Sequence, residues 1–135
     1  MGETNIVNSS GIILKWTLVA GSLFSFLGVG LGAFAAHELK QRLQPDLFSI
    51  FEVGVRYQMY HALALFAVAW AIDKYPQSTV YVAGYCFLGG IIIFSGSLYL
   101  LSITGIRWLG AITPIGGLLF LAGWLWFGWT IWRAG

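Results

Sequence analysis

The chain has 135 residues, of which 59% are hydrophobic and only 9% are charged. A soluble domain usually carries about 25% charged residues, so this chain cannot cover a water-facing surface, and its aromatic content is too high for a disordered protein. The net charge of +2 is too small for a nucleic-acid-binding surface, so no nucleic-acid partner is expected. The single cysteine excludes an internal disulfide and any metal cluster that needs several cysteines. The composition therefore predicts a membrane protein with the lipid bilayer as its first partner.

Four runs without charge predict four transmembrane helices. The runs are 21, 16, 32 and 25 residues long and cover 16–36, 57–72, 75–106 and 108–132. A helix needs about 20 apolar residues to cross a core of roughly 30 Å, and the short run suffices if its helix begins near Val53. The runs are continuously apolar, which favours helices over a barrel. We predict an all-α bundle with spans near 12–36, 53–72, 79–102 and 108–132, forming one domain over 12–135 after a polar extension at 1–11.

The ends of these spans predict the topology. Four tryptophans fall on one side as an interfacial belt, together with both termini: Trp16, Trp70, Trp129 and Trp132. The other side carries the 37–55 connection and the 103–107 turn. Within the connection, Pro45 and Asp46 indicate a helix start, and the pattern that follows indicates an amphipathic helix running into the second span. Basic residues number four against three, which barely determines the orientation and leans toward a cytoplasmic connection.

Polar side chains concentrate near the connection side of the predicted bundle. Glu38 and Arg42 stand four residues apart, as do Glu52 and Arg56, so each is expected to form an ion pair along its helix. We interpret the second pair as mutual neutralisation at the membrane entry, with a ligand or ion site as the alternative. The candidate site consists of these residues: His37, Glu52, Arg56, Tyr57, Gln58, Tyr60 and His61.

The two histidines could be haem or metal ligands, or a proton relay, because both lie toward one face of the membrane. They stand on different helices with no cysteine partner and no recognisable ligand spacing. We therefore expect His37 to cap the first span and His61, about 7–8 Å deeper than Arg56, to bond across the bundle. No metal, no cofactor and no catalytic residue is predicted, because no nucleophile–base pair, carboxylate pair or phosphate loop is recognisable.

Small residues mark the expected helix contacts. Gly28 and Gly32 form a GxxxG pair that Ala36 extends, and such ridges let helices approach closely in lipid. Further packing positions are predicted in the third and fourth spans: Gly96, Pro114, Gly116 and Gly117. Pro114 is expected about two turns inside the fourth helix, where a missing backbone N–H would kink it.

Four motifs resemble those of a known family. Gly32-Ala33-Phe34-Ala35-Ala36-His37-Glu38-Leu39-Lys40 resembles the signature of the domain-of-unknown-function 423 family, with Ala35 and Glu38 in place of two glycines. The segments 52–64, 94–99 and 112–117 resemble its other motifs, in order. The resemblance covers about residues 18 to 132 and implies a small four-span protein of bacterial inner membranes. It implies no activity, but the candidate-site residues fall within its motifs.

Three functions remain open. The leading hypothesis is a non-enzymatic accessory subunit or scaffold, whose polar residues dock a membrane-protein partner or a second copy, or stiffen the bundle. The first alternative is a small transporter or channel lined by His61 and the Glu52–Arg56 pair. The second is a haem- or quinone-associated redox component. A transport path should continue across the membrane, yet the polar side chains stop roughly halfway.

Overall fold

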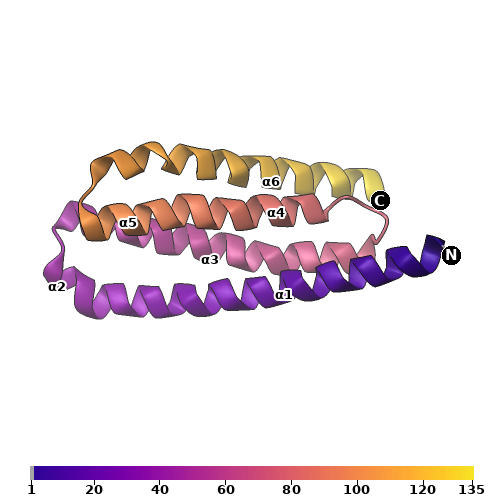
Figure 1. Ribbon diagram of the computed structural model, residues 1–135, viewed down its shortest axis with the longest axis horizontal. Coiled ribbons are helices and arrows are strands. Elements are labelled where there is room, and N and C mark those ends of the chain that lie inside the picture. Colours follow the sequence, from indigo (N-terminus) through magenta and orange to yellow (C-terminus); the bar gives the residue numbers. More distant parts are fainter. Residues whose placement is uncertain (1) are drawn as a thin grey trace.

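The computed structural model describes the backbone of residues 2–135 and the side chains from residue 9 onward. Four helical rods lie antiparallel, side by side (Figure 1). The first comprises α1 (Gly2–Phe34), the π-helical turn η1 (Ala35–Leu39) and α2 (Lys40–Arg42). The second is α3 (Pro45–Lys74). The third comprises α4 (Tyr81–Gly90), a second π-helical turn η2 (Ile91–Ser95) and α5 (Gly96–Thr104), and the fourth joins the 3₁₀ segment η3 (Arg107–Ala111) to α6 (Thr113–Ala134).

The rods are ordered α1, α3, α4–α5, α6 across the bundle (Figure 1). α1 packs mainly on α3, and the α4–α5 rod packs against both α3 and α6. Three rods in the described part of the chain are long and apolar enough to cross a membrane, and they cover Ser9–Arg42, Tyr81–Thr104 and Arg107–Ala134. The remaining rod, α3, is the most polar of the four. Both ends of the chain lie at the same end of the bundle (Figure 1).

α3 is one uninterrupted helix of 30 residues. It begins at Pro45, whose missing N–H would have no helical partner at this position, and Asp46 stands in the first turn. The amphipathic start predicted for residues 45–55 therefore continues into the predicted second span without a break. Residues 2–11, which the sequence sets apart as a polar extension, are likewise part of the continuous helix α1.

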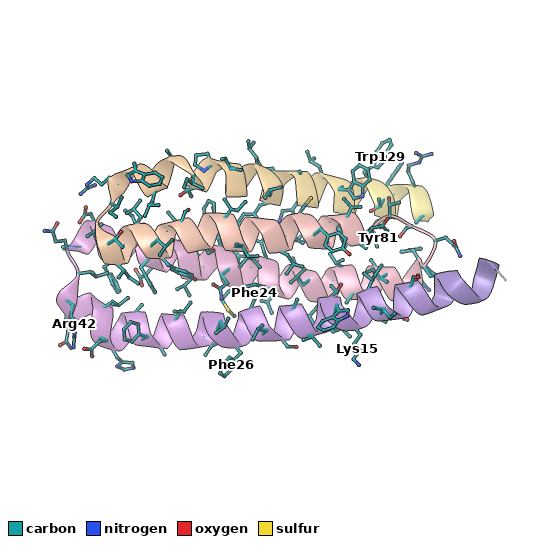
Figure 2. All side chains as sticks on the ribbon, in the orientation of Figure 1. Lys15, Phe24, Phe26, Arg42, Tyr81 and Trp129 are labelled. Carbon is teal, nitrogen blue, oxygen red and sulfur yellow. The ribbon has the colours of Figure 1, made fainter. Side chains whose placement is uncertain are left out.

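The first rod contacts α3 through small residues of α1 and η1 that are spaced by seven. Gly21, Gly28 and Ala35 are buried, and a Cβ added at Gly21 would lie 3.2 Å from the Ala62 carbonyl oxygen. A Cβ at Gly28 would collide with Met59. A seven-residue spacing keeps one stripe facing a neighbouring helix, which allows this close approach. The opposite face is bare: Phe26 is 74% exposed and points away from the bundle, whereas Phe24 points inward (Figure 2).

The predicted ridge is thus only partly the observed one. Gly28 lies at the contact, but Gly32 is half-buried, and a Cβ there would make only an ordinary contact with Val55. Ala36 is exposed, because the buried stripe passes through Ala35. The predicted ridge has a spacing of four, which turns away from α3 along a helix of 3.6 residues per turn. The observed spacing of seven stays closer to one face of the helix.

The first rod ends later than predicted. Helical structure continues past residue 36 through η1 and ends at Arg42, before the extended residues Leu43 and Gln44. His37 therefore lies within the rod, where its side chain is exposed and makes no capping hydrogen bond. The expectation that His37 caps this helix is wrong, since the helix provides no free end at that position.

Pro114 also differs from the expectation. It stands in the first turn of α6, directly after the 3₁₀ segment, so it begins a helix instead of kinking one. A first-turn proline leaves no donor unsatisfied. The preceding rod ends at Thr104. The next residue, Gly105, adopts a left-handed conformation with φ of +71° and donates its N–H to the Leu101 carbonyl oxygen, which closes α5.

Other glycines permit the tightest contacts in the second half. A Cβ at Gly116 would lie 2.8 Å from Phe94 Cα, and one at Gly123 would lie 2.6 Å from the Phe87 ring. Gly117 leaves ordinary contact distance to Phe94, and Gly96, although predicted as a packing position, has open space beside it. The main core lies between these rods around Leu65, Val68, Phe87 and Ile91.

Candidate binding groove between α3 and α6

A groove of about 890 Å³ lies between α3 and α6. It exists because the α4–α5 rod stands between these two helices, so α3 and α6 meet in only a few places. Its lining joins aromatic rings to aliphatic side chains and comes from α3, η2 and α6: Tyr57, Tyr60, His61, Leu63, Phe94, Pro114, Gly117, Leu118, Phe120, Leu121 and Trp124. We call this cavity the α3–α6 groove.

His61 forms the floor of the groove, and it is buried. Its Nδ1 lies 2.7 Å from the Tyr57 carbonyl oxygen, and its Nε2 lies 3.1 Å from Trp124 Nε1. A carbonyl can only accept and an indole N–H can only donate, so Nδ1 carries the proton and Nε2 accepts. These two bonds fix a neutral imidazole with a single tautomer. The expected bond across the bundle is therefore present, and it reaches α6.

Aromatic rings enclose the imidazole. The Phe120 ring is parallel to it with centroids 3.5 Å apart, and Phe87 and Trp124 approach its other sides. Because both ring nitrogens are engaged and the faces are covered, His61 could bind a metal or relay a proton only after losing one of its hydrogen bonds. Among the described residues, no group of three metal-binding side chains gathers here or elsewhere.

Gln58 lies on the opposite side of α3, away from the groove. Its Nε2 donates to the Phe24 carbonyl oxygen at 2.8 Å, and its Oε1 accepts from the Tyr99 hydroxyl at 2.7 Å. One buried amide thus joins α1, α3 and α5. Ser95 donates to the Gly54 carbonyl oxygen in the same region, and Ser97 bonds to Thr113 between α5 and α6.

These polar groups satisfy one another. In the part of the chain whose side chains are described, the hydroxyl of Ser25 is the one buried side-chain polar atom without a partner. Buried polar groups are costly when unpaired and specify a unique packing when paired. The interior polar residues therefore hold the rods in register.

The expected pair of Glu52 and Arg56 is not formed. Both side chains are exposed, and neither makes an ion pair within the described residues. An exposed pair contributes only about 0–1 kcal/mol, which does not compensate for ordering two long side chains. The predicted polar network comprises His37, Glu52, Arg56, Tyr60 and His61, and within the described residues no two of these side chains bond to each other.

The ion pairs that do form lie nearer the end of the bundle. Glu38 pairs with Arg42, as predicted from their spacing. Arg107 donates to Asp46 at 3.0 Å and so ties the start of α3 to η3. This hydrogen bond, with a second from the Leu47 N–H, holds the pKa of the Asp46 carboxyl below its usual value.

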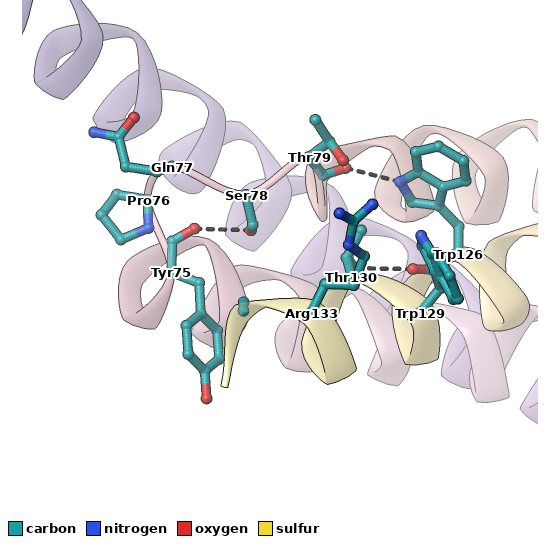
Figure 3. Close-up of a pocket in the computed structure, with 10 residues that line it drawn as sticks. Tyr75, Pro76, Gln77, Ser78, Thr79, Trp126, Trp129, Thr130 and Arg133 are labelled. Carbon is teal, nitrogen blue, oxygen red and sulfur yellow. Dashed lines mark hydrogen bonds between the residues drawn. The ribbon is translucent and has the colours of Figure 1, made fainter.

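Another pocket, of about 560 Å³, lies at the opposite end between the 75–79 turn and the end of α6 (Figure 3). Trp126 donates its indole N–H to the Thr79 carbonyl oxygen, and Arg133 stands 5.6 Å from the centre of the Trp129 ring. The hydrogen bond from Trp126 fastens the turn to α6, whereas the contact between Arg133 and Trp129 lies within α6 itself. The pocket contains none of the predicted site residues, which favours the α3–α6 groove as the candidate site.

The comparisons with known proteins identify the family. A family model described as "Protein of unknown function (DUF423)" matches residues 31–117, which are more than half of the chain. The chain belongs to the DUF423 family. The UPF0382 membrane protein YwdK of Bacillus subtilis is 45% identical over 113 residues, covering 83% of this chain and 92% of that protein. A UPF0382 membrane protein of Staphylococcus haemolyticus is 47% identical over 112 residues, covering 83% and 91%. No solved structure matches significantly.

The family resemblance read from the sequence is thus confirmed, and this DUF423 protein is a membrane protein. The structure gathers Tyr57, Tyr60, His61, Pro114 and Gly117 into one groove. Gln58 serves a separate contact, and His37 stands exposed within the first rod.

The groove's remaining aromatic residues, Phe94, Phe120 and Trp124, were not predicted as site residues. Phe94 opens the family motif at 94–99 but is apolar like its neighbours, and Phe120 and Trp124 lie in no motif. The one available signal was the spacing of Gly117, Phe120 and Trp124 by three and four, which places them on one helix face.

Proposed function

We propose that this DUF423 protein is a four-span, non-enzymatic protein of the bacterial inner membrane that acts as an accessory subunit or scaffold. The observation that carries the proposal is that its buried polar side chains, within the described residues, are almost all hydrogen-bonded inside the bundle. Gln58 and His61 use their hydrogen-bonding atoms to join helices, and both Ser95 and Thr113 bond within the bundle. Buried polar side chains whose hydrogen bonds join helices to one another are typical of a rigid framework.

The apolar outer faces support a partner within the membrane. α1 packs mainly on α3, which leaves a wide face open, including Trp16, Phe26 and Val29. Apolar exposure alone fits lipid as well as protein. The proposed partner is another membrane protein or a second copy of this chain, held on the outer face of α1.

Photo-crosslinking in native membranes tests this proposal. A photoreactive residue replaces Phe26 on the outer face of α1, and a matched one replaces Leu125, which is 76% exposed on α6. We expect a discrete higher-mass protein adduct from position 26 and only lipid adducts from position 125. Lipid adducts alone from both positions would overturn the scaffold proposal.

The transporter and redox alternatives receive less support. The His61 imidazole is enclosed by rings and held by two hydrogen bonds, so it presents no free nitrogen to an ion path or a haem iron. Purified protein without a visible chromophore, and vesicles without ion or proton flux through the reconstituted chain, are the outcomes that we expect.

A further inference from the structure

An ordered stripe of exposed side chains runs along α3 beside the α3–α6 groove. Glu52, Arg56, Tyr60 and Leu63 follow one another at spacings of four, four and three, so they share one helix face. All four are exposed. The stripe passes from an acid through a base and a phenol to an aliphatic residue, moving from the start of α3 toward its middle.

The polar groups of this stripe, and the neighbouring Tyr57 hydroxyl of the groove, are free to bind. Glu52 and Arg56 form no ion pair, although their spacing would permit one, and the hydroxyls of Tyr57 and Tyr60 make no hydrogen bond within the described residues. Two opposite charges and two phenol donors therefore border the apolar groove. By the helical rise, Glu52 stands about 6 Å beyond Arg56, and Arg56 about 10 Å from Leu63.

The groove has the length of one leaflet. Its α6 wall runs from Pro114 to Trp124, which is about 15 Å along the helix, or half of a core of roughly 30 Å. The part of its wall further from Arg56 is apolar and includes Leu63, Leu118 and Leu121. An occupant should therefore present an apolar chain in the groove and its polar groups at the Arg56 end.

We infer that the α3–α6 groove and the α3 stripe bind a phospholipid whose headgroup carries a primary amine. Its acyl chain lies in the groove, its phosphate accepts from Arg56 and the phenols, and its ammonium donates to Glu52. The order of the groups along the lipid is the order of the partners along α3. A choline headgroup has no N–H to donate, and a glycerol headgroup places no cation beside Glu52.

Native mass spectrometry of the full chain in detergent tests this assignment. The probes are phosphatidylethanolamine, phosphatidylcholine and phosphatidylglycerol with identical acyl chains. We expect phosphatidylethanolamine to be retained best. Arg56→Gln should lower the retention of all three about tenfold, because each loses a charge-assisted hydrogen bond to its phosphate. Glu52→Gln should abolish the preference for phosphatidylethanolamine over phosphatidylglycerol.

The groove is tested separately from the headgroup site. Leu118→Trp fills the groove and should reduce the retention of every lipid, whereas Leu125→Trp, at another exposed leucine of α6 outside the groove, should not. Arg133→Gln, at the other end of the bundle, is the matched control for charge and should leave retention unchanged. All of these side chains are exposed, so the variants should fold, which helical circular dichroism verifies.

Three outcomes would overturn the inference. Equal retention of the three lipids removes the headgroup assignment, and retention unchanged by Arg56→Gln removes the phosphate site. Retention unchanged by Leu118→Trp removes the groove. Lipid binding is measured on the isolated chain, so these results do not depend on whether a protein partner binds the outer face of α1.

Discussion

Single polar side chains set how the rods of this bundle align. The Gln58 amide is the strongest example, because one side chain bonds to α1 and α5 at once. Its removal leaves the half-buried Tyr99 hydroxyl without its acceptor, and a polar group that loses its partner away from water costs more than the bond itself contributed. The effect of a substitution at Gln58 on stability therefore depends mainly on which partner groups it leaves without a hydrogen bond.

A double-mutant cycle on Gln58 and Tyr99 measures this balance. Gln58→Leu alone should lower the free energy of unfolding by about 1–3 kcal/mol, because the Tyr99 hydroxyl is left unpaired. The addition of Tyr99→Phe should recover part of that loss. Thermal unfolding of the four proteins in detergent gives the coupling energy. Additive losses from the two substitutions would show that the bond does not contribute.

The pair between Asp46 and Arg107 should make stability depend on pH. The pKa of Asp46 is lowered in the fold, chiefly by the hydrogen bond from Arg107, so its contribution is complete above the unfolded value of 3.8. That contribution is lost as the pH falls through the folded pKa. Unfolding temperatures of wild type and Asp46→Asn should therefore differ at neutral pH and converge in acid. Arg107→Gln should converge in the same way, and a gap that persists in acid would contradict the account.

Sequence alone identified several residues of the groove but not their connections. Tyr57, Tyr60 and His61 stand out because polar and ionisable groups are rare in apolar helices. The spacing of Glu52 and Arg56 predicted a pair that is absent, since local spacing does not report whether two exposed side chains repay the entropy of ordering. Trp124, the partner of His61, lies 63 residues away, and its spacing from Gly117 and Phe120 places it on a helix face without pairing it with His61.

Among the elements, α3 is the central one, and glycine contacts fix its distance from α1. The charge-free runs predicted all four rods, because a continuous apolar stretch of sufficient length leaves few alternatives to a helix. They did not predict the π-helical turns at 35–39 and 91–95. Such turns arise from tertiary fit, as at η2, where Phe94 packs directly on Gly116.

A matched pair of glycine substitutions in α1 tests the contact with α3. Gly28→Leu places bulk against Met59, whereas Gly30 is exposed with open space around it. Both substitutions improve helix propensity equally, so their difference reports packing alone. Gly28→Leu should be less stable than Gly30→Leu by about 1–3 kcal/mol in thermal unfolding in detergent. Equal stability of the two variants would place the contact elsewhere on α1.

At the scale of the whole molecule, the two ends of the chain and the 75–80 turn lie at one end of the bundle, and the 43–44 and 105–106 connections lie at the other (Figure 1). Exposed tryptophans mark the terminal end, including Trp16, Trp70 and Trp132. An aromatic girdle of this kind belongs at a membrane interface. With both chain ends at one end of the bundle, we propose that α3 crosses the membrane as well, with the long side chain of Arg56 reaching the interface from just inside it.

Thiol labelling tests the crossing of α3, on which the four-span topology depends. In a Cys86→Ser background, Gln44→Cys and Ser78→Cys place one thiol at each end of α3. An impermeant reagent added to intact cells should label one thiol and not the other, because the proposed four-span topology puts the two ends of α3 on opposite sides of the membrane. Reporter fusions after residue 135 and before residue 1 should agree with the Ser78 thiol. Labelling of both thiols from the same side would mean that α3 lies outside the bilayer and that the chain crosses it three times. The termini would then report opposite sides, so the two measurements check each other.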